Sequence, residues 1–445
     1  MTAPVRNKIV VLDDDPTGCQ TVHSCLLLTR WDVDTLVEAL MDASPLMFVL
    51  TNTRALTAER AAAVTREVST HLVAALERLA QQGCAVRPLF VSRSDSTLRG
   101  HYPVETDIMN EVLGPFDAHF LVPAFFEGGR ITRNGTHYLM VDGKPVPVHE
   151  TEFARDSVFG YHHSHLPDYV AEKTAGRIPA ASVRVLTPLA LTGEPGRPLR
   201  VLHDNACVVV DAETPADLER FARHVHASAT SGKHWLFRSA ASLLTALARL
   251  EPQPVAAEHM ATYTRNGRPG VVVVGSHVPT TTRQLERLLL EPGVVGIEID
   301  VSRLPHDRQA LFDTAVAAVF QAYARDMTAV VYTSRTERSF ASQSQRLAFG
   351  EQVSGLLMDI VRVLPQDIGF LISKGGITSN DVLSDGLALA SSRVLGQILP
   401  GCPVVRCPGT HARYPDLPVV IFPGNVGNET ALATVWRRLS GAMAT

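Results

Sequence analysis

Three consecutive carboxylates follow an apolar run near the start of the chain. The run "KIVVL" leads into "DDDPTG", which begins with Asp13, Asp14 and Asp15. A carboxylate at the end of a buried strand can hold a cation, or it can orient a hydroxyl group and accept its proton. Because three negative charges repel a phosphate, we predict that this loop faces a hydroxyl-bearing ligand rather than a phosphate group.

A second loop mixes both signs of charge with hydroxyl groups. The stretch "SRSDSTLRG" places Arg93, Asp95, Ser96, Thr97 and Arg99 within seven residues. Arginine forks match a carboxylate and aspartate accepts hydrogen bonds from hydroxyl groups, so the set suits a small polyhydroxy acid. Spacing alone leaves a structural interpretation open beside acid binding. In that interpretation Asp95 and Arg99 form a local ion pair and helix cap, and Arg130 is a solvated loop residue.

The second half of the chain carries loops of a different kind. "GSHVPTTTRQ", "KGGITSND" and "PGNVGNET" each follow an apolar run and precede a helical pattern. Small residues there let backbone N–H groups approach an anion, although glycine and hydroxyl residues also make ordinary turns. None matches a Walker loop or a dinucleotide fingerprint. Three such loops in one region favour a phosphate-rich ligand, most simply a nucleotide. Lys374 either reaches the phosphates of that ligand or is a solvated lysine.

The elements that must position these loops form an α/β pattern. Short β-branched runs alternate with longer segments of helical period, which predicts two α/β domains with mainly parallel sheets flanked by helices. Residues 1–250 form the first domain, the Pro- and Gly-containing stretch 251–269 a linker, and residues 270–445 the second domain. Around Asp142 and Gly143, two extended runs predict a hairpin.

Composition excludes several classes of protein. The formal charge of -4 provides no overall field for nucleic acid or an anionic membrane, so we expect neither partner. No stretch approaches the roughly 20 apolar residues of a membrane span, and the start of the chain is too acidic for a signal peptide, which favours a cytoplasmic protein. The six cysteines are scattered, and we expect reduced thiols rather than a metal site.

Taken together, the motifs resemble the four-carbon acid sugar kinase family. The resemblance runs through "DDPTG", "DSTLRG", "PAFFEGGR" with "NGTHY", and "HETEFARD" to "GSHVPTTTRQ", "GGITS" and "PGNVGN", and so covers nearly the whole chain. It implies a kinase that phosphorylates tetronic acids such as threonate, erythronate or their oxo derivatives with ATP. The active site would lie in the cleft between the acid-binding N-terminal domain and the ATP-binding C-terminal domain, with Mg²⁺ accompanying ATP.

The resemblance also implies roles for individual residues. The catalytic candidates are Asp14 and Asp15, one of which would orient or deprotonate the terminal hydroxyl. The acid would be bound by Asp95, Ser96, Thr97, Arg99 and Arg130, with Arg99 on its carboxylate. The nucleotide would be bound by Ser276, Gly375, Gly376, Ile377, Thr378, Gly424 and Gly427. The magnesium ligands, the stereoisomer of the acid and the oligomeric state stay open, with a homodimer as one expectation.

Some residues depart from the family pattern. Many relatives continue the first motif with Ala and then an acidic residue or Asn, where this chain has Cys19 and Gln20, and Arg93 stands where lysine is common. These changes bear on which acid is used. Two other hypotheses remain: a non-catalytic sensor of sugar acids or nucleotides, which would need no acidic cluster, and a nicotinamide-dependent oxidoreductase, which the missing glycine fingerprint disfavours.

Overall fold

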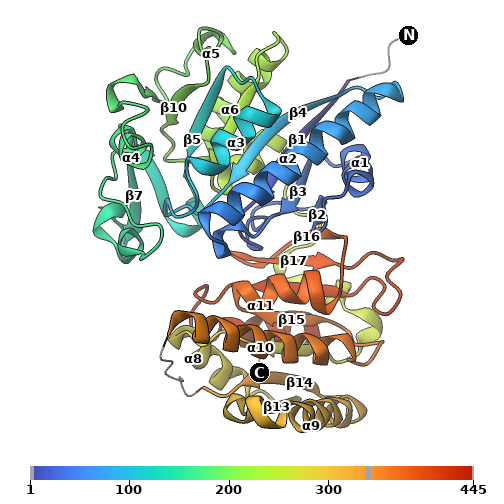
Figure 1. Cartoon of the computed structure of the whole chain (residues 1–445). Coiled ribbons are helices and arrows are strands. Elements are labelled where there is room, and N and C mark those ends of the chain that lie inside the picture. The colour runs from blue at the N-terminus through green and yellow to red at the C-terminus, as the bar shows by residue number, and fades with distance from the viewer. Residues whose placement is uncertain (1–4, 336–341, 443–445) are drawn as a thin grey trace. The chain divides into compact units, whose positions relative to one another are not determined.

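The computed structural model describes residues 5–335 and 342–442 (Figure 1). Its contacts divide the chain into two compact units, residues 1–252 and 253–445. Both units are α/β, as the alternating sequence pattern predicts. The stretch 253–269 belongs to the second unit, where the Thr264 hydroxyl donates to the carbonyl of Leu439 at 2.7 Å.

The first unit is built on a parallel sheet with the strand order β2-β3-β1-β4-β11-β5-β10-β9. Its strands are buried along most of their length because helices cover them, and they therefore read as continuous apolar runs. They are β1 (Arg6–Asp13), β2 (Leu26–Leu28), β3 (Leu46–Leu50), β4 (Val86–Arg93), β5 (Ala118–Val122), β9 (Arg184–Leu186), β10 (Ala206–Val210) and β11 (Trp235–Ser239).

Helices pack on both faces of this sheet. On one face of the sheet, Phe90 packs in a cluster with Leu36, Leu72 and Met109, which belong to three helices. On the opposite face of the sheet, Phe120 of β5 contacts Phe221 of a fourth helix. The helices are α1 (Val33–Met41), α2 (Ala58–Gln81), α3 (Val104–Leu113), α4 (Leu166–Lys173), α5 (Arg197–Arg200), α6 (Pro215–Ala229) and α7 (Ser242–Ala248).

A small antiparallel sheet extends the first unit. It consists of β6 (Arg130–Arg133), β7 (Thr136–Val141) and β8 (Lys144–Pro147) in that order. Asp142 and Gly143 form the turn between β7 and β8, both with positive φ (49° and 77°). Because that geometry favours Asp-Gly, the predicted hairpin is confirmed, and β6 adds a third strand that begins at a predicted binding residue.

The second unit has the strand order β13-β14-β12-β15-β18-β17-β16. The first five strands of this order are parallel, and β17 pairs antiparallel with both of its neighbours. The strands are β12 (Val271–Val274), β13 (Val294–Ile299), β14 (Thr328–Thr333), β15 (Leu371–Lys374), β16 (Ser391–Leu399), β17 (Cys402–Arg406) and β18 (Pro418–Phe422).

The helices of the second unit bury their apolar faces on this sheet. Leu285, Leu432 and Trp436 share a core cluster with Val272 and Ile372. The helices are α8 (Pro279–Leu288), α9 (Leu304–Ala324), α10 (Gln343–Arg362), α11 (Gly376–Asp381) and α12 (Ala431–Ser440). Within the described ranges, no helix is long and apolar enough to cross a membrane.

Candidate active site

The parallel register of the first unit gathers its charged loops at one edge. Asp13, the last residue of β1, pairs with Leu50 of β3 on one side and with Arg93 of β4 on the other. The carbonyl of Asp13 accepts from the backbone N–H of Thr51 at 2.9 Å. Since parallel strands end at the same edge, the loops after β1, β3 and β4 all begin there, as expected for a ligand site in this class of fold.

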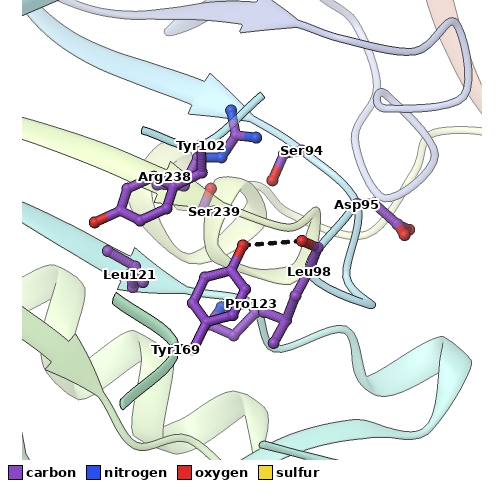
Figure 2. A pocket seen from close by; sticks show the side chains of 9 residues that line it. All are labelled: Ser94, Asp95, Leu98, Tyr102, Leu121, Pro123, Tyr169, Arg238 and Ser239. Carbon is purple, nitrogen blue, oxygen red and sulfur yellow. Dashed lines mark hydrogen bonds between the residues drawn. The ribbon is translucent and has the colours of Figure 1, made fainter. Parts of the chain in front are cut away.

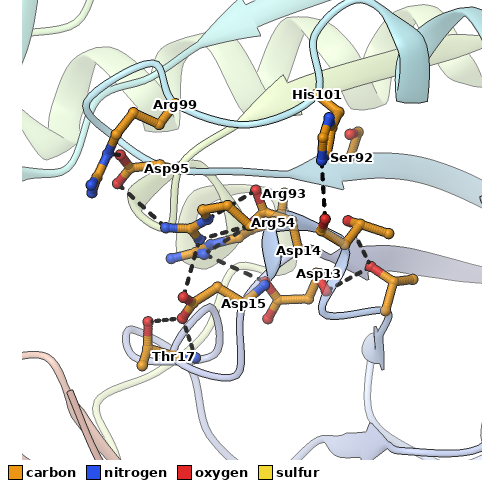
Figure 3. Close-up of polar contacts among 12 residues, drawn as sticks. Asp13, Asp14, Asp15, Thr17, Arg54, Ser92, Arg93, Asp95, Arg99 and His101 are labelled. Carbon is orange, nitrogen blue, oxygen red and sulfur yellow. Dashed lines mark hydrogen bonds and ion pairs between the residues drawn. The ribbon is translucent and has the colours of Figure 1, made fainter. Parts of the chain in front are cut away.

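Asp14 is a buried carboxylate held by two arginines. Arg54 donates from Nη2 to Oδ1 at 2.8 Å and from Nε to Oδ2 at 3.3 Å, and Arg93 Nη1 lies 3.4 Å from Oδ1 (Figure 3). Its exposed fraction is only 1%. Burial raises the pKa of Asp14 above its ordinary value, against the opposing charges of Arg54 and Arg93.

Asp15 is the more accessible member of the pair, with a side chain 24% exposed. The Thr17 hydroxyl and backbone N–H both donate to Oδ1, at 2.5 and 2.9 Å, and Arg54 Nη2 lies 3.5 Å from Oδ2. Desolvation raises the pKa of Asp15, but Arg54, Arg93 and these hydrogen bonds together hold it below the ordinary value. Asp15 is therefore ionised at neutral pH and fixed in direction, which suits it to accept a hydrogen bond from a substrate hydroxyl.

Asp13 lies behind the loop. Its side chain is fully buried, Oδ2 has no hydrogen-bond partner, and a Cβ at position 18 would come within 2.0 Å of Oδ2, so only glycine fits there. Burial raises the pKa of Asp13 to about 8 although Arg93 Nη1 lies 3.5 Å from Oδ1. Asp13 thus packs inside the loop that presents Asp14 and Asp15.

The acid-binding candidates after β4 form a connected loop. Arg99 Nε donates to Asp95 Oδ2 at 2.6 Å, and the Thr97 hydroxyl donates to the same oxygen. Arg54 Nη1 lies 3.8 Å from Asp95 Oδ1, which joins this loop to Asp14 and Asp15. Arg54 and Arg99 hold the pKa of Asp95 below its ordinary value despite burial. The local ion pair that spacing suggested is present, and it belongs to a larger charged network.

Three side chains from elsewhere fix the backbone of this loop. His137 Nε2 donates to the carbonyl of Ser96 at 2.8 Å, and Tyr161 OH donates to that of Thr97 at 2.8 Å. Tyr169 OH donates to the carbonyl of Leu98 at 2.9 Å (Figure 2). Leu98 has φ of 67°, a conformation that such contacts must stabilise. Burial lowers the pKa of His137 to about 4, so it is neutral and holds the loop as an uncharged donor.

A pocket opens beside this loop (Figure 2). Ser239 Oγ, at the end of β11, is buried there without a hydrogen-bond partner. A buried polar atom without a partner is costly, so this hydroxyl suits a ligand oxygen or a water molecule. The pocket combines polar groups with an apolar wall and is lined by Ser94, Asp95, Leu98, Tyr102, Leu121, Pro123, Tyr169, Arg238 and Ser239.

Arg130 has fewer partners than the other arginines of this region. It begins β6, its guanidinium lies 5.9 Å from the centre of the Phe125 ring, and its Nε is buried without a hydrogen-bond partner. Desolvation lowers the pKa of Arg130, and the charge of Asp95 acts in the opposite direction. Arg99 by contrast contacts Asp95 and lies 3.9 Å from Asp156. Arg130 is therefore the arginine best able to take a new anionic partner.

Sequence reasoning missed three charged residues at this edge, namely Arg54, Arg238 and Glu105. Arg54 lies two positions after the end of the run "LMFVLTN" and binds Asp14. Arg238 lies inside β11, where its Nη1 donates to Glu105 Oε2 at 2.5 Å and to Ser92 Oγ at 2.7 Å. An arginine within "WLFRS" breaks an apolar run that is otherwise typical of a strand, and that interruption was the available signal.

In the second unit, the loops after β12, β15 and β18 come together. The Thr281 hydroxyl donates to Ser276 Oγ at 3.2 Å and to the carbonyl of Gly424 at 3.0 Å. A Cβ at Gly375, where φ is 122°, would lie 3.1 Å from Ser276 Cβ and 3.2 Å from Thr378 Oγ1. Ser276, Gly375, Thr378 and Gly424 thus form one group lined by hydroxyl and backbone atoms.

The remaining predicted nucleotide residues lie around this group. A Cβ at Gly376 would meet nothing within 4 Å, and Ile377 beside it is 69% exposed. Gly427 has φ of 80°, and its carbonyl accepts from Gln284 Nε2 at 3.4 Å. Gly376 and Ile377 therefore offer an open surface at the start of α11, whereas Gly427 shapes the neighbouring loop.

Lys374 is neither solvated nor extended toward an open loop. It has no exposed surface, and its Nζ donates to the carbonyls of Pro423 at 2.6 Å and Gly424 at 3.2 Å. The same atom lies 3.9 Å from the centre of the Phe422 ring. Burial lowers the pKa of Lys374 to about 7. This side chain ties the β18 loop to the end of β15.

No group of three or more His, Cys, Asp or Glu side chains among the described residues could hold a metal ion. Mg²⁺ commonly keeps several waters and binds through one or two carboxylates together with substrate phosphates, so it needs no such cage. At the loops of the second unit, the hydroxyl oxygens of Ser276 and Thr378 lie close to Gly375.

Comparison with characterised kinases covers nearly the whole chain. A D-erythronate kinase from Heliobacterium modesticaldum is 27% identical, with 96% of each chain covered. A D-threonate kinase from Bordetella bronchiseptica is 26% identical over 95% of each chain, and a D-threonate kinase from Salmonella typhimurium is 25% identical over 96% of each.

Solved structures share the fold. A Salmonella typhimurium LT2 protein superposes with a TM-score of 0.67 at 20% identity, covering 97% of this chain and 99% of its own. A Haemophilus influenzae protein gives 0.64 at 18% identity, covering 97% and 100%. Residues 9–247 match the model of a sugar-binding N-terminal domain, and residues 271–432 match that of a nucleotide-binding C-terminal domain. The chain belongs to the family that joins these two domains, the four-carbon acid sugar kinases that its motifs resemble.

Proposed function

We propose that this protein is an ATP-dependent kinase that phosphorylates the terminal hydroxyl of a four-carbon sugar acid, either threonate, erythronate or an oxo-tetronate. The observation that carries the proposal is the division of chemistry between the two units. Charged and hydroxyl-bearing loops meet at one edge of the first sheet, and glycine, serine and threonine loops meet at one edge of the second. The names and full-length coverage of the curated relatives support it.

The first unit would bind and orient the acid. Arg130 has buried donor capacity to spare, so it would pair with the substrate carboxylate, with Arg99 beside it. Asp95, Ser96 and Thr97 supply the loop that would contact the hydroxyl groups. Such fixed groups lower the entropy lost when the acceptor is positioned for attack.

Asp15 would act on the attacking hydroxyl. Its carboxylate is ionised, partly exposed and held by Thr17 and Arg54, so it accepts a hydrogen bond from that hydroxyl in a fixed direction. The hydroxyl oxygen forms the new bond to the γ-phosphorus, the bond to the bridging oxygen of ADP breaks, and the hydroxyl proton passes to the carboxylate. Asp14 lies deeper and would hold Arg54 in place as well as add negative charge.

The second unit would bind ATP. Backbone groups of the loops at Gly375, Gly376 and Gly424, with the hydroxyls of Ser276 and Thr378, would surround the phosphates, since small residues allow close approach. Ile377 offers an exposed apolar surface beside them. Mg²⁺ would reach the site on the phosphate oxygens and would neutralise the charge that develops on the transferred group.

A panel assay tests the proposal directly. ADP release is coupled to a spectroscopic signal while the D and L forms of threonate and erythronate and the oxo-tetronates are each supplied with Mg-ATP. We expect ADP formation with at least one acid, and a phosphorylated acid of matching amount by mass spectrometry. Mg-ATP binding without turnover of any acid would instead support a sensor, and NAD-dependent oxidation of an acid would support an oxidoreductase.

A further inference from the structure

One arginine near the glycine loops has no assigned role. Arg335 comes two residues after the end of β14 (Thr328–Thr333), and β14 pairs in parallel with β12, whose own carboxyl end leads to Ser276. Arg335 therefore lies at the carboxyl edge of the sheet, where the predicted phosphate loops also begin. In the strand order β14-β12-β15-β18, β14 is the neighbour of β12 on the side away from β15 and β18.

The guanidinium of Arg335 is anchored at two points. Nη2 donates to the carbonyl of Ser276 at 2.7 Å and to Thr282 Oγ1 at 2.9 Å, and Nε lies 3.2 Å from the same hydroxyl. These contacts fix the planar fork against the loop between β12 and α8. Because the fork is already held, little conformational freedom remains to be lost when its other nitrogen binds a ligand.

The other nitrogen is unused. Arg335 Nη1 is buried and has no hydrogen-bond partner, and no carboxylate within the described ranges forms an ion pair with Arg335. The charges of Glu286 and Glu298 act on it from farther away, and desolvation lowers its pKa. A partly buried guanidinium with an unpartnered N–H edge, and with no ion pair to a described residue, is well suited to bind an anionic oxygen.

The neighbouring cation cannot fill this role. Lys374 is fully buried, and its Nζ already donates to two carbonyls beneath the loop at Gly424. Lys374 therefore shapes the loop, whereas Arg335 lies against the Ser276 backbone with donor capacity left over.

We infer that Arg335 binds a phosphate oxygen of the nucleotide through Nη1 while its Nη2 positions the Ser276 loop. The inference rests on the proposed function, because it requires the second unit to take a nucleotide. It adds a side-chain charge, from a residue just after β14, to a site otherwise composed of hydroxyl and backbone groups.

Equilibrium titration of the full chain with two ligands tests this inference. Mg-ADP carries the phosphates, and adenosine lacks them. In Arg335→Gln, we expect the Kd of Mg-ADP to rise about ten-fold or more, as for loss of a charge-assisted hydrogen bond, while that of adenosine is unchanged. Arg335→Lys keeps the charge without the fork and should lie between the wild type and Arg335→Gln.

Two controls separate a ligand contact from a structural effect. Arg325→Gln removes the same charge from an exposed position at the C-terminal end of α9, before β14 begins, and should leave both affinities unchanged. Thr282→Val removes one anchor but keeps the guanidinium, so it should weaken Mg-ADP binding less than Arg335→Gln. Equal losses for adenosine and Mg-ADP, or no loss for either, would overturn the inference while leaving a nucleotide site in the second unit. A wild-type chain that binds neither ligand would overturn the nucleotide assignment and the inference together.

Discussion

The edge of the first sheet carries side-chain charges, whereas the edge of the second is lined mainly by small residues. Asp14, Asp15 and Asp95 share the guanidinium of Arg54, whose positive charge offsets part of their combined negative charge. In the second unit, a buried lysine faces two carbonyls and hydroxyls bridge the loops. An acid with several hydroxyl groups needs donors and acceptors in chosen directions, and a phosphate chain needs close approach of many donors.

Loss of the accessible carboxylate should have the largest effect. Asp15→Asn keeps the size of the side chain but removes its ability to accept the proton and weakens its hold on the hydroxyl. We expect kcat to fall by about 10²- to 10⁴-fold, while the Kd of Mg-ATP stays unchanged. Steady-state assay and titration of the same preparation measure the two quantities.

A matched control for this change is Asp34→Asn, which removes an exposed carboxylate of α1 that pairs with Arg78. It should retain wild-type kcat. Wild-type turnover in both Asp15→Asn and Asp14→Asn would exclude a catalytic carboxylate in this loop.

Breaking a buried ion pair of the first unit should cost more stability than breaking an exposed one. Arg238→Met leaves Glu105 without its arginine, and both side chains are only 6% exposed. An uncompensated buried charge costs about 3–5 kcal/mol, so the free energy of unfolding should fall by that amount. Urea denaturation followed by circular dichroism measures the loss.

The exposed pair Arg66 and Glu111 provides the comparison, with side chains 47% and 62% exposed. Solvent screens such a pair, and Arg66→Met should cost at most about 1 kcal/mol. Similar losses in both variants would show that the charged edge adds no more than a surface pair does.

The two units should respond to pH in opposite directions. Asp13 has a pKa of about 8 in the folded chain against 3.8 ordinarily, so the folded state holds a proton that the unfolded state has lost, and stability falls as pH rises through this window. Lys374 has a pKa of about 7 against 10.5, so the folded state binds fewer protons and stability rises with pH above about 7.

Denaturation of two variants across the pH range separates these contributions. Relative to wild type, Asp13→Asn should gain stability as pH rises from 3.8 to about 8, the two pKa values of Asp13. Lys374→Met should lose stability relative to wild type as pH rises above about 7. Each change should amount to at most about 1.4 kcal/mol per pH unit. Differences from wild type that do not vary with pH would contradict the buried, charge-penalised state of both groups.

Much of the fold could be predicted from the sequence. The runs "KIVVL", "RPLFVSR" and "ACVVVDA" are β1, β4 and β10, and the amphipathic stretch that stops at Gly83 is α2. Parallel strands buried on both faces have no alternating pattern, but their β-branched runs between helices are distinctive. The hairpin was predictable because Asp-Gly tolerates the positive φ values that its turn requires.

The partners of the charged residues could not be predicted. Arg238 and Glu105 lie 133 positions apart, and local patterns contain nothing that pairs them. A charged Arg238 argues against a buried strand unless its carboxylate partner, Glu105, is known. For that reason β11 was not predicted. Lys374 posed the same difficulty, since two carbonyls of a distant loop decide that it is buried rather than solvated.

The division of labour between the two units is tested most directly by the Michaelis constants of both substrates in two variants, Arg130→Gln and Thr378→Val. The account predicts that Arg130→Gln raises KM for the acid by about ten-fold or more and leaves KM for ATP unchanged, as expected for loss of a charged hydrogen bond. Thr378→Val should raise KM for ATP alone. A variant that raises KM for the other unit's substrate, or for both substrates equally, would contradict the account.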